Sequence, residues 1–471
     1  MNKTKIIATV GPATSDRETI KSLMLNGVDT LRINMSHSTP DFCREIVSIV
    51  NDLNEELNKY VAIMIDIKGP IVRLGKIQNN HAFLKKGDKI RILMEDVLGD
   101  CTKFSVDYKE LIDDVPLNTI LKIDDGLIEL KVLDKGFDYL LCEVLKEGEI
   151  ASNKTLNVPN IRLNREFLSE KDKKIIKLAH DLNVDFLALS FISSYEDILE
   201  VNDLLINLGN NHLQIISKIE NSCAVDDIDN IIKVSDGIMI ARGDLGAEIS
   251  LERIPGVQKR IISKCHAGGV VSIVATELLS NMTNFDHPTR AEVSDIANAV
   301  LDGTDAVMLS GETTVGKYPI EALKTMEKII KVAEMDIDYD NILEKSVKTE
   351  KRDVTGTIAY SVAGCALRLK CKAIFTPTMS GYTAKKISRF RPICPIIAPT
   401  PNFDTTKSLA LNFGVYPILI DDLKSIDAIV EKSKKMAKEM LSLKENDSII
   451  ITGGYPFKKI KSTNFMKIEE I

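Results

Sequence analysis

The chain of 471 residues lacks several features that mark large classes of proteins. It has no apolar run near the roughly 18 residues of a transmembrane helix, and its short N-terminal apolar stretch leads straight into Gly11 and Pro12, unlike a signal peptide. Its eight cysteines are scattered without a C-x-x-C pair, as is typical of free thiols in a reducing cytosol. The net charge of -7 disfavours a role in coating nucleic acid. We expect a cytoplasmic protein whose partners are neither membranes nor nucleic acids.

The composition is that of a soluble globular enzyme, with 44% hydrophobic and 27% charged residues, and the length suffices for about three domains. Short runs rich in Ile and Val alternate with helical patterns, which predicts parallel strands joined by crossover helices. The predicted strands are 6–10, 30–34, 61–66, 186–190, 214–219, 237–240, 270–275 and 306–309. Eight is the number of strands that closes a (β/α)8 barrel.

One stretch interrupts this alternation. From about residue 71 to 157 the helical period vanishes, and short alternating segments are separated by turn signals such as Asp125-Gly126, which predicts a small antiparallel barrel or sandwich. A polar bridge, 336–352, then leads to a helix and strands of a third, three-layer α/β unit. We therefore predict a TIM barrel formed by 1–70 and 158–335, an inserted β-barrel lid at 71–157, and a C-terminal α/β regulatory domain at 336–471.

Polar side chains follow seven of the eight predicted strands, at the carboxyl ends where such barrels carry their chemistry. Lys218 and Glu220 lie two residues apart on one strand and so point to the same side, and Asp244 follows the next strand. Two hard carboxylates beside a lysine predict a Mg²⁺ or Mn²⁺ site built for an oxyanion. The alternative is that Lys218 and Glu220 form an ordinary salt bridge.

A second cation site is suggested by Asn34, Ser36 and Asp66 at neighbouring strand ends. Their oxygens bring only one negative charge, which fits a monovalent ion, while local turn hydrogen bonds are the alternative. Arg32 and Arg73 are candidate phosphate forks, because a guanidinium can bind phosphate at two points, although either could be a solvated surface arginine.

Small and hydroxyl-bearing residues complete the pattern. Gly243 and Asp244 can present backbone amides to a carboxylate, and Thr276 offers a hydroxyl for proton transfer. The histidines have no metal-binding spacing, and only His37 falls near the predicted site. In the C-terminal unit a hydroxyl-rich loop at the start of a helix predicts a phosphate-binding effector site, or else a simple N-cap. Its residues are Thr376, Thr378, Ser380, Gly381 and Thr383.

These residues lie in segments that resemble the pyruvate kinase family along essentially the whole chain. The stretch IISKIENSCAVDDID resembles the active-site signature of the family. Further matching segments, in order, are KTKIIATVGPAT, LRINMSH, IDIKGPIVRLG, IDDGLI, ARGDLGAEI, PGVQK, HPTRAEVSDIANAVLDGTDAVMLSGET, GKYP and ISRFRP.

The resemblance implies transfer of the phosphoryl group of phosphoenolpyruvate to ADP, in the last step of glycolysis. It implies that Lys218 stabilises the transition state, that Glu220 and Asp244 hold Mg²⁺, and that Arg32, Gly243, Asp244 and Thr276 bind phosphoenolpyruvate. Arg73, His37 and Lys154 would contact the nucleotide, and Asn34, Ser36, Asp66 and the carbonyl of Ile67 would bind K⁺. It also implies a mobile lid with Asp125 on its inner edge, a homotetramer, and a phosphorylated effector in the C-terminal domain.

Several positions depart from the family pattern. Ile67 and Ile71 replace the Thr and Glu that usually accompany a K⁺ requirement, and Glu277 stands where the family usually has Gln. Asn153, Ser193 and Ser194 occupy positions that are commonly basic. Because each change near the phosphates removes positive charge or adds negative charge, we expect weaker substrate or nucleotide affinity than in typical relatives.

Two other functions compete with this interpretation. Another Mg²⁺-dependent barrel that forms an enolate, such as an aldolase or phosphoenolpyruvate mutase, would lack the inserted lid and the third domain. A non-catalytic or weakened relative with a binding or regulatory role would not need to keep Lys218, Glu220, Asp244, Arg32 and Thr276, all of which are present.

Overall fold

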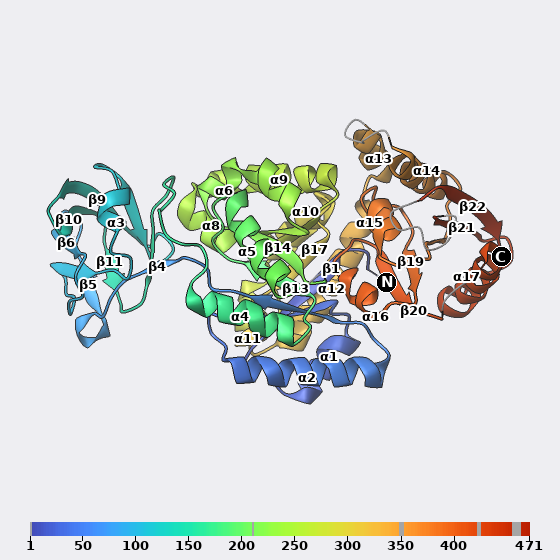
Figure 1. Cartoon of the computed structure of the whole chain (residues 1–471), viewed down its shortest axis with the longest axis horizontal. Coiled ribbons are helices and arrows are strands. Elements are labelled where there is room, and N and C mark those ends of the chain that lie inside the picture. The colour runs from blue at the N-terminus through green and yellow to red at the C-terminus, as the bar shows by residue number, and fades with distance from the viewer. Residues whose placement is uncertain (1, 210–211, 348–352, 422–424, 455–462) are drawn as a thin grey trace.

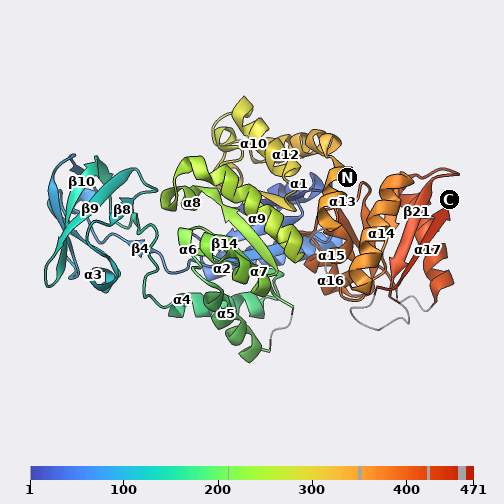
Figure 2. The ribbon, with the colours of Figure 1, turned by 90° about the horizontal axis from the view of Figure 1, so that it is seen from above.

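The computed structural model describes residues 2–209, 212–347, 353–421, 425–454 and 463–471. Three parts lie in a row, with the inserted β-module at one end, the barrel in the middle and the C-terminal unit at the other end (Figure 1). The view from above shows the same order (Figure 2).

The central part is a closed barrel of eight parallel strands, which confirms the predicted fold class. In chain order the strands are β1 (Lys5–Val10), β2 (Thr30–Asn34), β3 (Ala62–Asp66), β13 (Phe186–Leu189), β14 (Gln214–Ile219), β15 (Gly237–Ala241), β16 (Val271–Ala275) and β17 (Ala306–Leu309). The barrel closes where β1 pairs with β17. These strands are buried on both faces, which explains why they appear in the sequence as mainly apolar runs.

Helices cover the outside of the barrel. The main ones are α1 (Arg17–Leu25), α2 (Pro40–Leu57), α4 (Glu170–Asp181), α5 (Tyr195–Asn207), α7 (Ile228–Val234), α9 (Ile254–Gly268), α10 (Arg290–Leu301) and α12 (Pro319–Ala333). Short helices follow three strand ends, namely α6 (Ser222–Asp226), α8 (Arg242–Glu248) and α11 (Gly311–Thr314). The apolar faces of the helices and the outer faces of the strands form one large hydrophobic cluster.

The inserted module leaves the barrel after β3 and returns before α4. Its main sheet has the order β4 (Val72–Arg73), β12 (Thr155–Asn157), β8 (Ile120–Ile123), β9 (Ile128–Lys135), β10 (Tyr139–Lys146), β6 (Lys89–Leu93) and β7 (Lys103–Ser105). All neighbours pair antiparallel except β6 and β7, which are parallel. A β-bridge between Leu74 and Val106 joins the two outer strands, so that the sheet curls into a small barrel around its own core. A separate pair, β5 (Ala82–Leu84) with β11 (Gly148–Ile150), and the short α3 (Leu111–Asp114) complete it.

The C-terminal unit contains a five-stranded sheet with the order β20 (Val415–Leu419), β19 (Ile396–Thr400), β18 (Ala373–Phe375), β21 (Ser448–Gly453) and β22 (Phe465–Glu470). Only β22 runs antiparallel to its neighbour. Its helices are α14 (Val354–Arg368), α15 (Tyr382–Ser388), α16 (Phe403–Ser408) and α17 (Ile426–Leu441), and two hydrophobic clusters lie on the two faces of the sheet.

The segment predicted as a polar bridge, 336–352, contains a helix that was not predicted, α13 (Tyr339–Val347). Ile342 packs against the barrel core and Leu343 against the C-terminal core. Tyr339 also packs against the barrel core, and so few apolar contacts leave too weak a period to predict a helix from sequence. Residues 348–352 of the bridge lie outside the described part of the chain.

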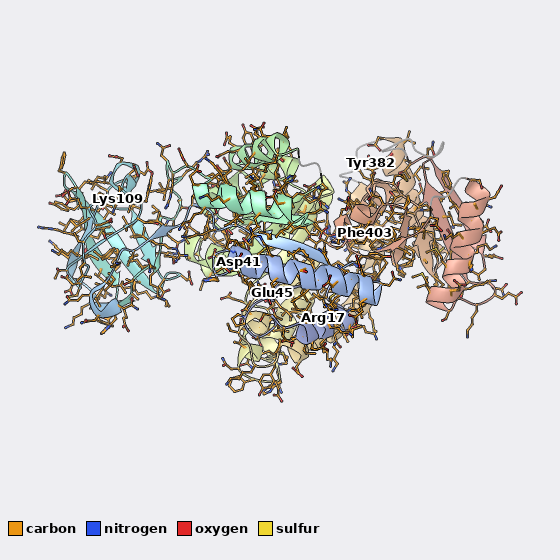
Figure 3. The ribbon with its side chains drawn as sticks, turned by 60° about the horizontal axis from the view of Figure 1, so that its bottom comes forward. Arg17, Asp41, Glu45, Lys109, Tyr382 and Phe403 are labelled. Atoms are coloured by element: carbon orange, nitrogen blue, oxygen red, sulfur yellow. The ribbon has the colours of Figure 1, made fainter. Side chains whose placement is uncertain are left out.

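The C-terminal unit closes the amino-terminal end of the barrel. Ala410 and Leu411, which follow α16, join the cluster of side chains that fills the barrel interior. Acidic residues that precede barrel strands pair with cations of the C-terminal unit: Asp305 contacts Arg391 at 2.8 Å. Phe403 lies where α16 faces the barrel (Figure 3), and its ring centroid is 6.2 Å from that of Tyr60. The chemistry is therefore left to the opposite, carboxyl end, beside the inserted module.

Candidate active site

A buried ion cluster occupies the carboxyl end of the barrel. The Nζ atom of Lys218 lies 2.8 Å from Oε1 of Glu220 and 3.2 Å from Oδ2 of Asp66, and it donates a hydrogen bond of 2.7 Å to the hydroxyl of Ser190. Arg32 donates to Asp66 Oδ2 from both Nε, at 2.8 Å, and Nη2, at 2.6 Å. These five residues come from four adjacent strands, β2, β3, β13 and β14, and all are buried. The predicted ion pair of Lys218 and Glu220 is thus part of a larger cluster.

The ion pairs determine how these groups titrate. Burial alone would raise the pKa of Asp66, but Lys218 and Arg32 lower it below its usual value. Burial lowers the pKa of Lys218, yet Asp66 and Glu220 outweigh burial and raise it, so the ammonium stays charged. Burial raises the pKa of Glu220 to about 7, against the effect of Lys218, and the nearby Asp244 carboxylate adds to the rise. Lys218 is therefore a buried cation that lies between Asp66 and Glu220.

Thr276 and Gly243 lie side by side at the next strand ends. The Gly243 amide donates to Thr276 Oγ1 at 2.8 Å, and that hydroxyl donates to the Ala275 carbonyl at 2.6 Å. The Gly243 amide, predicted as a donor to substrate, is therefore already hydrogen-bonded within the protein. Asp244 follows in the first turn of α8, close enough to Glu220 to affect its pKa.

Thr276 and Glu277 both have left-handed backbones, with φ of 69° and 55°. This conformation is strained for a β-branched residue such as Thr, so surrounding contacts must hold it. The buried Arg242 does so: its Nη2 donates to the carbonyls of Thr276, at 2.7 Å, and Glu277, at 3.2 Å, while its Nη1 pairs with Asp295 at 2.8 Å. The sequence analysis did not find this function of the Arg242 side chain, nor the link that Ser190 makes between Asp66 and Lys218. Their only sequence signal was a polar residue at a strand end.

The predicted monovalent site is differently arranged. The Asn34 side-chain oxygen accepts from the Ser36 amide at 3.0 Å, which is the local turn bond that was the alternative to ion binding. Both oxygens of Asp66 already face Arg32, Lys218 and the Ser190 hydroxyl. His37 is exposed beside this turn. The residues predicted to bind a monovalent ion therefore lie close together, but the negative charge of Asp66 is already paired with Arg32 and Lys218.

The lid module reaches the barrel through two loops. Lys154 pairs with both oxygens of Asp124 at 2.7 Å, and Arg73 Nη1 donates to the Asn153 carbonyl at 2.7 Å. Asp124 and Asp125 both adopt left-handed backbones in the turn before β9. Burial raises the pKa of Asp125, and the Asp244 carboxylate raises it further, so this lid residue faces the barrel carboxylates.

The predicted effector loop contains a turn that precedes helix α15 and a buried hydroxyl, that of Thr376, without a hydrogen-bond partner among the described residues. The Gly381 amide donates to Thr378 Oγ1 at 2.9 Å, and Gly381, with φ of +75°, precedes α15. Thr383 bonds Thr463 at 2.8 Å, whereas the buried Thr376 hydroxyl has no hydrogen-bond partner among the described residues. Tyr382 lies between Gly381 and Thr383 of this loop (Figure 3), and Ser380 is exposed.

The carboxylates fit a hard divalent cation, which prefers oxygen ligands. The buried Oε1 of Glu220 accepts no hydrogen bond from the described residues, although the Lys218 ammonium lies beside it. Within the described ranges no group of three or more His, Cys, Asp or Glu side chains converges as a complete metal cage. Glu220 and Asp244 can therefore supply part of a coordination shell that substrate or water oxygens would complete.

Comparisons with known proteins agree along the whole chain. Family models described as pyruvate kinase, barrel domain, and pyruvate kinase, alpha/beta domain, match residues 1–323 and 356–469. Pyruvate kinases of Clostridium perfringens and Clostridium acetobutylicum are each 41% identical to the chain over its full length and theirs. A pyruvate kinase of Staphylococcus aureus (strain MRSA252) is 40% identical over 99% of the chain and 80% of its own length. A crystal structure of a pyruvate kinase from Cryptosporidium parvum superposes with a TM-score of 0.94 at 33% identity, covering 100% of this chain and 96% of that one.

The barrel, its inserted module and these matches define a phosphotransferase built on a TIM barrel. The chain belongs to the pyruvate kinase family. Members of this family generally depend on a metal ion. In the described part of the chain, no helix is both long and apolar enough to cross a membrane.

Proposed function

We propose that this chain transfers the phosphoryl group of phosphoenolpyruvate to ADP, giving pyruvate and ATP in the last step of glycolysis. The observation that carries the proposal is the buried ammonium of Lys218, 2.8 Å from Glu220 and 3.2 Å from Asp66, at the carboxyl end of the barrel. A fixed cation in a site from which water is largely excluded stabilises negative charge that develops during transfer far better than one in bulk water does.

We assign a divalent cation, Mg²⁺ or Mn²⁺, to the carboxylates of Glu220 and Asp244. When bound, it would neutralise phosphoryl and enolate oxygens. Glu220 is fully buried, and the Asp244 carboxylate lies close enough to act on its pKa, which supports the assignment of both carboxylates to one cation. Because burial raises the pKa of Glu220, cation binding competes with protonation of this carboxyl group.

Lys218 then has one electrostatic task during the reaction. The bond between phosphorus and the enol oxygen breaks, a bond to an ADP phosphate oxygen forms, and the enol oxygen keeps the electron pair as an enolate. The ammonium of Lys218 stabilises this oxygen and the phosphoryl group in transit, and Asp66 and Ser190 keep the ammonium in place. Arg32 is assigned to the phosphate of phosphoenolpyruvate. Its guanidinium would then donate hydrogen bonds to both the phosphate and Asp66.

A proton must next reach the enolate carbon to give pyruvate. The Thr276 hydroxyl lies at the strand end next to Gly243, and the Ser310 hydroxyl is a buried oxygen without a hydrogen-bond partner among the described residues. We assign the proton route to these two hydroxyls, with Thr276 and the backbone around Gly243 and Asp244 also contacting the substrate carboxylate. The Gly243 amide would exchange its bond to Thr276 for one to the substrate.

The inserted module is assigned the function of a lid. It would bring Asp125 and Lys154 over the site and exclude water from the transferring group. Arg73, His37 and Lys154 are the residues we assign to the nucleotide. The raised pKa of Asp125 beside Asp244 supports a lid tip that faces the barrel carboxylates.

Further assignments rest on the family alone or on partial geometry. A K⁺ ion is assigned to Asn34, Ser36, Asp66 and the Ile67 carbonyl, and a phosphorylated effector to Thr376, Thr378, Ser380, Gly381 and Thr383. We propose a cytoplasmic homotetramer. The three domains are assigned to 1–70 with 158–335, to 71–157 and to 336–471, because a separate hydrophobic core supports each one.

A coupled assay tests the proposal. Pyruvate formed from phosphoenolpyruvate and ADP is followed through lactate dehydrogenase, with Mg²⁺ or Mn²⁺ and with K⁺ present or replaced by an organic cation. We expect turnover that requires the divalent cation and both substrates. An absence of turnover under all of these conditions would exclude the activity.

A further inference from the structure

The two chain crossings that connect barrel and lid carry a group of cations. Lys68 and Arg73 lie on the outgoing crossing, where Lys68 is two residues beyond Asp66 and Arg73 ends β4. Arg165 lies on the returning crossing, between β12 and α4. Of these three cations, only Arg73 was predicted from the sequence to bind a ligand.

Arg165 ties the two crossings together. Its Nη1 donates to the Ile71 carbonyl at 3.0 Å, and the same atom lies 3.6 Å from Oδ1 of Asp107 in the lid. Its guanidinium carbon is 5.7 Å from the centroid of the Tyr108 ring. Within the described residues Nε and Nη2 of Arg165 make no hydrogen bond. The Arg165 side chain is therefore held in place by Nη1, while Nε and Nη2 remain available to donate hydrogen bonds to a ligand.

The charges around Lys68 are poorly balanced. The cations Arg73, Lys171 and Arg165 lie close enough to Lys68 to act on its charge, as does the carboxylate of Asp107. The half-buried ammonium of Lys68 has no hydrogen-bond or ion-pair partner among the described residues. Asp107 is moreover committed to the backbone, since its Oδ1 accepts from the Arg73 amide at 2.8 Å. A partly desolvated group of cations with so little counter-charge is a site for an anion.

There is room beside Arg165 for a ligand. A cavity of about 420 Å³ opens between the crossings and the barrel, and its lining includes Ile71, Val72, Asn164 and Arg165. Arg162 lines the same cavity, but its charge is neutralised by Glu196 at 3.3 Å and Asp197 at 3.5 Å. Arg162 thus provides a matched control on the same loop.

We propose that Arg165, with Lys68, forms a binding subsite for the phosphate groups of a nucleoside diphosphate and so extends the contact assigned to Arg73. This subsite deepens the proposed function and rests on it. It supplies positive charge on the side where Ser193 and Ser194 offer none. Because Arg165 also bonds the outgoing crossing at Ile71, a phosphate bound there would connect the nucleotide to the hinge of the lid.

The test measures equilibrium binding of ADP, and separately of inorganic pyrophosphate, by titration calorimetry without phosphoenolpyruvate. The variants are Arg165→Gln, Arg165→Lys, Asp107→Asn and the control Arg162→Gln, each checked for its thermal midpoint and circular dichroism. We expect about tenfold weaker binding of both ligands for Arg165→Gln, partial rescue by Arg165→Lys, and a change within about twofold for Arg162→Gln.

Asp107→Asn separates an anion subsite from a structural clamp. Asn keeps the oxygen that accepts from the Arg73 amide but removes the competing charge, so we expect binding to become a few-fold tighter and more sensitive to salt. If Arg165 served only to hold the lid through Asp107, both variants would weaken binding alike, and the inference would be overturned. Loss of phosphoenolpyruvate affinity with unchanged ADP affinity in Arg165→Gln would also overturn it.

The binding result and the catalytic result are independent. Turnover in the unmodified enzyme with unchanged ADP binding in Arg165→Gln would refute the subsite and leave the proposed activity intact. Binding of ADP that depends on Arg165, in an enzyme without turnover, would support the subsite and refute the activity.

Discussion

The carboxylate of Asp66 is the counter-ion that stabilises two buried cations, Arg32 and Lys218, inside the barrel. Its removal should therefore lower the free energy of unfolding. Asp66 is 1% exposed, accepts two bonds from Arg32 at 2.8 and 2.6 Å, and lies 3.2 Å from Lys218. In Asp66→Asn the shape is kept, but Arg32 loses its counter-ion and Lys218 retains only Glu220. Removing one partner from a buried ion pair costs about 3–5 kcal/mol. We expect a loss of this size in the free energy of unfolding of the barrel.

The same variant should respond more strongly to anions. Arg32 is left unpaired, and Lys218 keeps only one of its two carboxylates, in the place where we assign the substrate phosphate, so inorganic phosphate should restore part of the lost stability. A ligand at one hundred times its dissociation constant contributes about 2.7 kcal/mol. Calorimetric unfolding with and without phosphate measures both effects. The control is Asp52→Asn, since Asp52 is exposed and 3.9 Å from Arg17, where a surface pair contributes less than about 1 kcal/mol.

Two results would refute this reasoning. Equal stability losses in Asp66→Asn and Asp52→Asn would mean that the buried charges are compensated by groups other than Asp66. An identical phosphate effect in the variant and the unmodified protein would mean that Arg32 and Lys218 are not the cations that meet the anion.

Three further predictions concern other parts of the molecule. Burial lowers the pKa of His266 to about 4, and the adjacent guanidinium of Arg391 adds to the effect, so the stability that the neutral imidazole contributes is full above the ordinary pKa of 6.5 and is lost as pH falls towards 4. At about 1.4 kcal/mol per pKa unit, the loss in free energy of unfolding is on the order of 3 kcal/mol. In pH-dependent calorimetry His266→Asn should remove most of this loss, and an unchanged slope of stability against pH would contradict the prediction. Arg242→Lys removes the hydrogen bonds to the carbonyls of Thr276 and Glu277 and should lower kcat/KM for phosphoenolpyruvate by about tenfold or more. Kinetics like those of the unmodified enzyme would show that the left-handed backbone conformation does not depend on Arg242. Glu277→Gln should lower the KM of an anionic substrate by a few-fold, an effect that shrinks as salt is added because the side chain is exposed; a KM that does not change at low salt would count against the expected charge effect.

The barrel could be predicted from sequence because its strands obey one local rule. Strands buried on both faces require mainly apolar runs, and the runs that end in Ala241 and Leu309 stop where the polar site begins. Helix α13 could not be predicted in the same way, since its order depends on two separate cores that meet it through Ile342 and Leu343. Strand β22, Phe465–Glu470, was missed because charged residues at an edge hide its pairing with β21.

The site was predictable as a set of residues and less so as a set of contacts. Lys218, Glu220 and Asp66 were found at strand ends, but nothing local to the sequence says that Ser190 joins two of them. The guanidinium of Arg32 was predicted to bind phosphate, and in the structure it donates hydrogen bonds to Asp66. Such pairings follow from which strands are neighbours across the barrel, which spacing along the chain does not record.

The central claim is that the buried ammonium of Lys218 carries phosphoryl transfer. The most direct test is kcat for pyruvate formation in Lys218→Met, a side chain of similar length without charge, with Mg²⁺ binding and the thermal midpoint measured on the same samples. If charge stabilisation by Lys218 dominates, kcat should fall by at least about 10² to 10³, the range seen when one preorganised donor is removed from an active site. A variant that folds, binds Mg²⁺ and turns over at the rate of the unmodified enzyme would contradict the account.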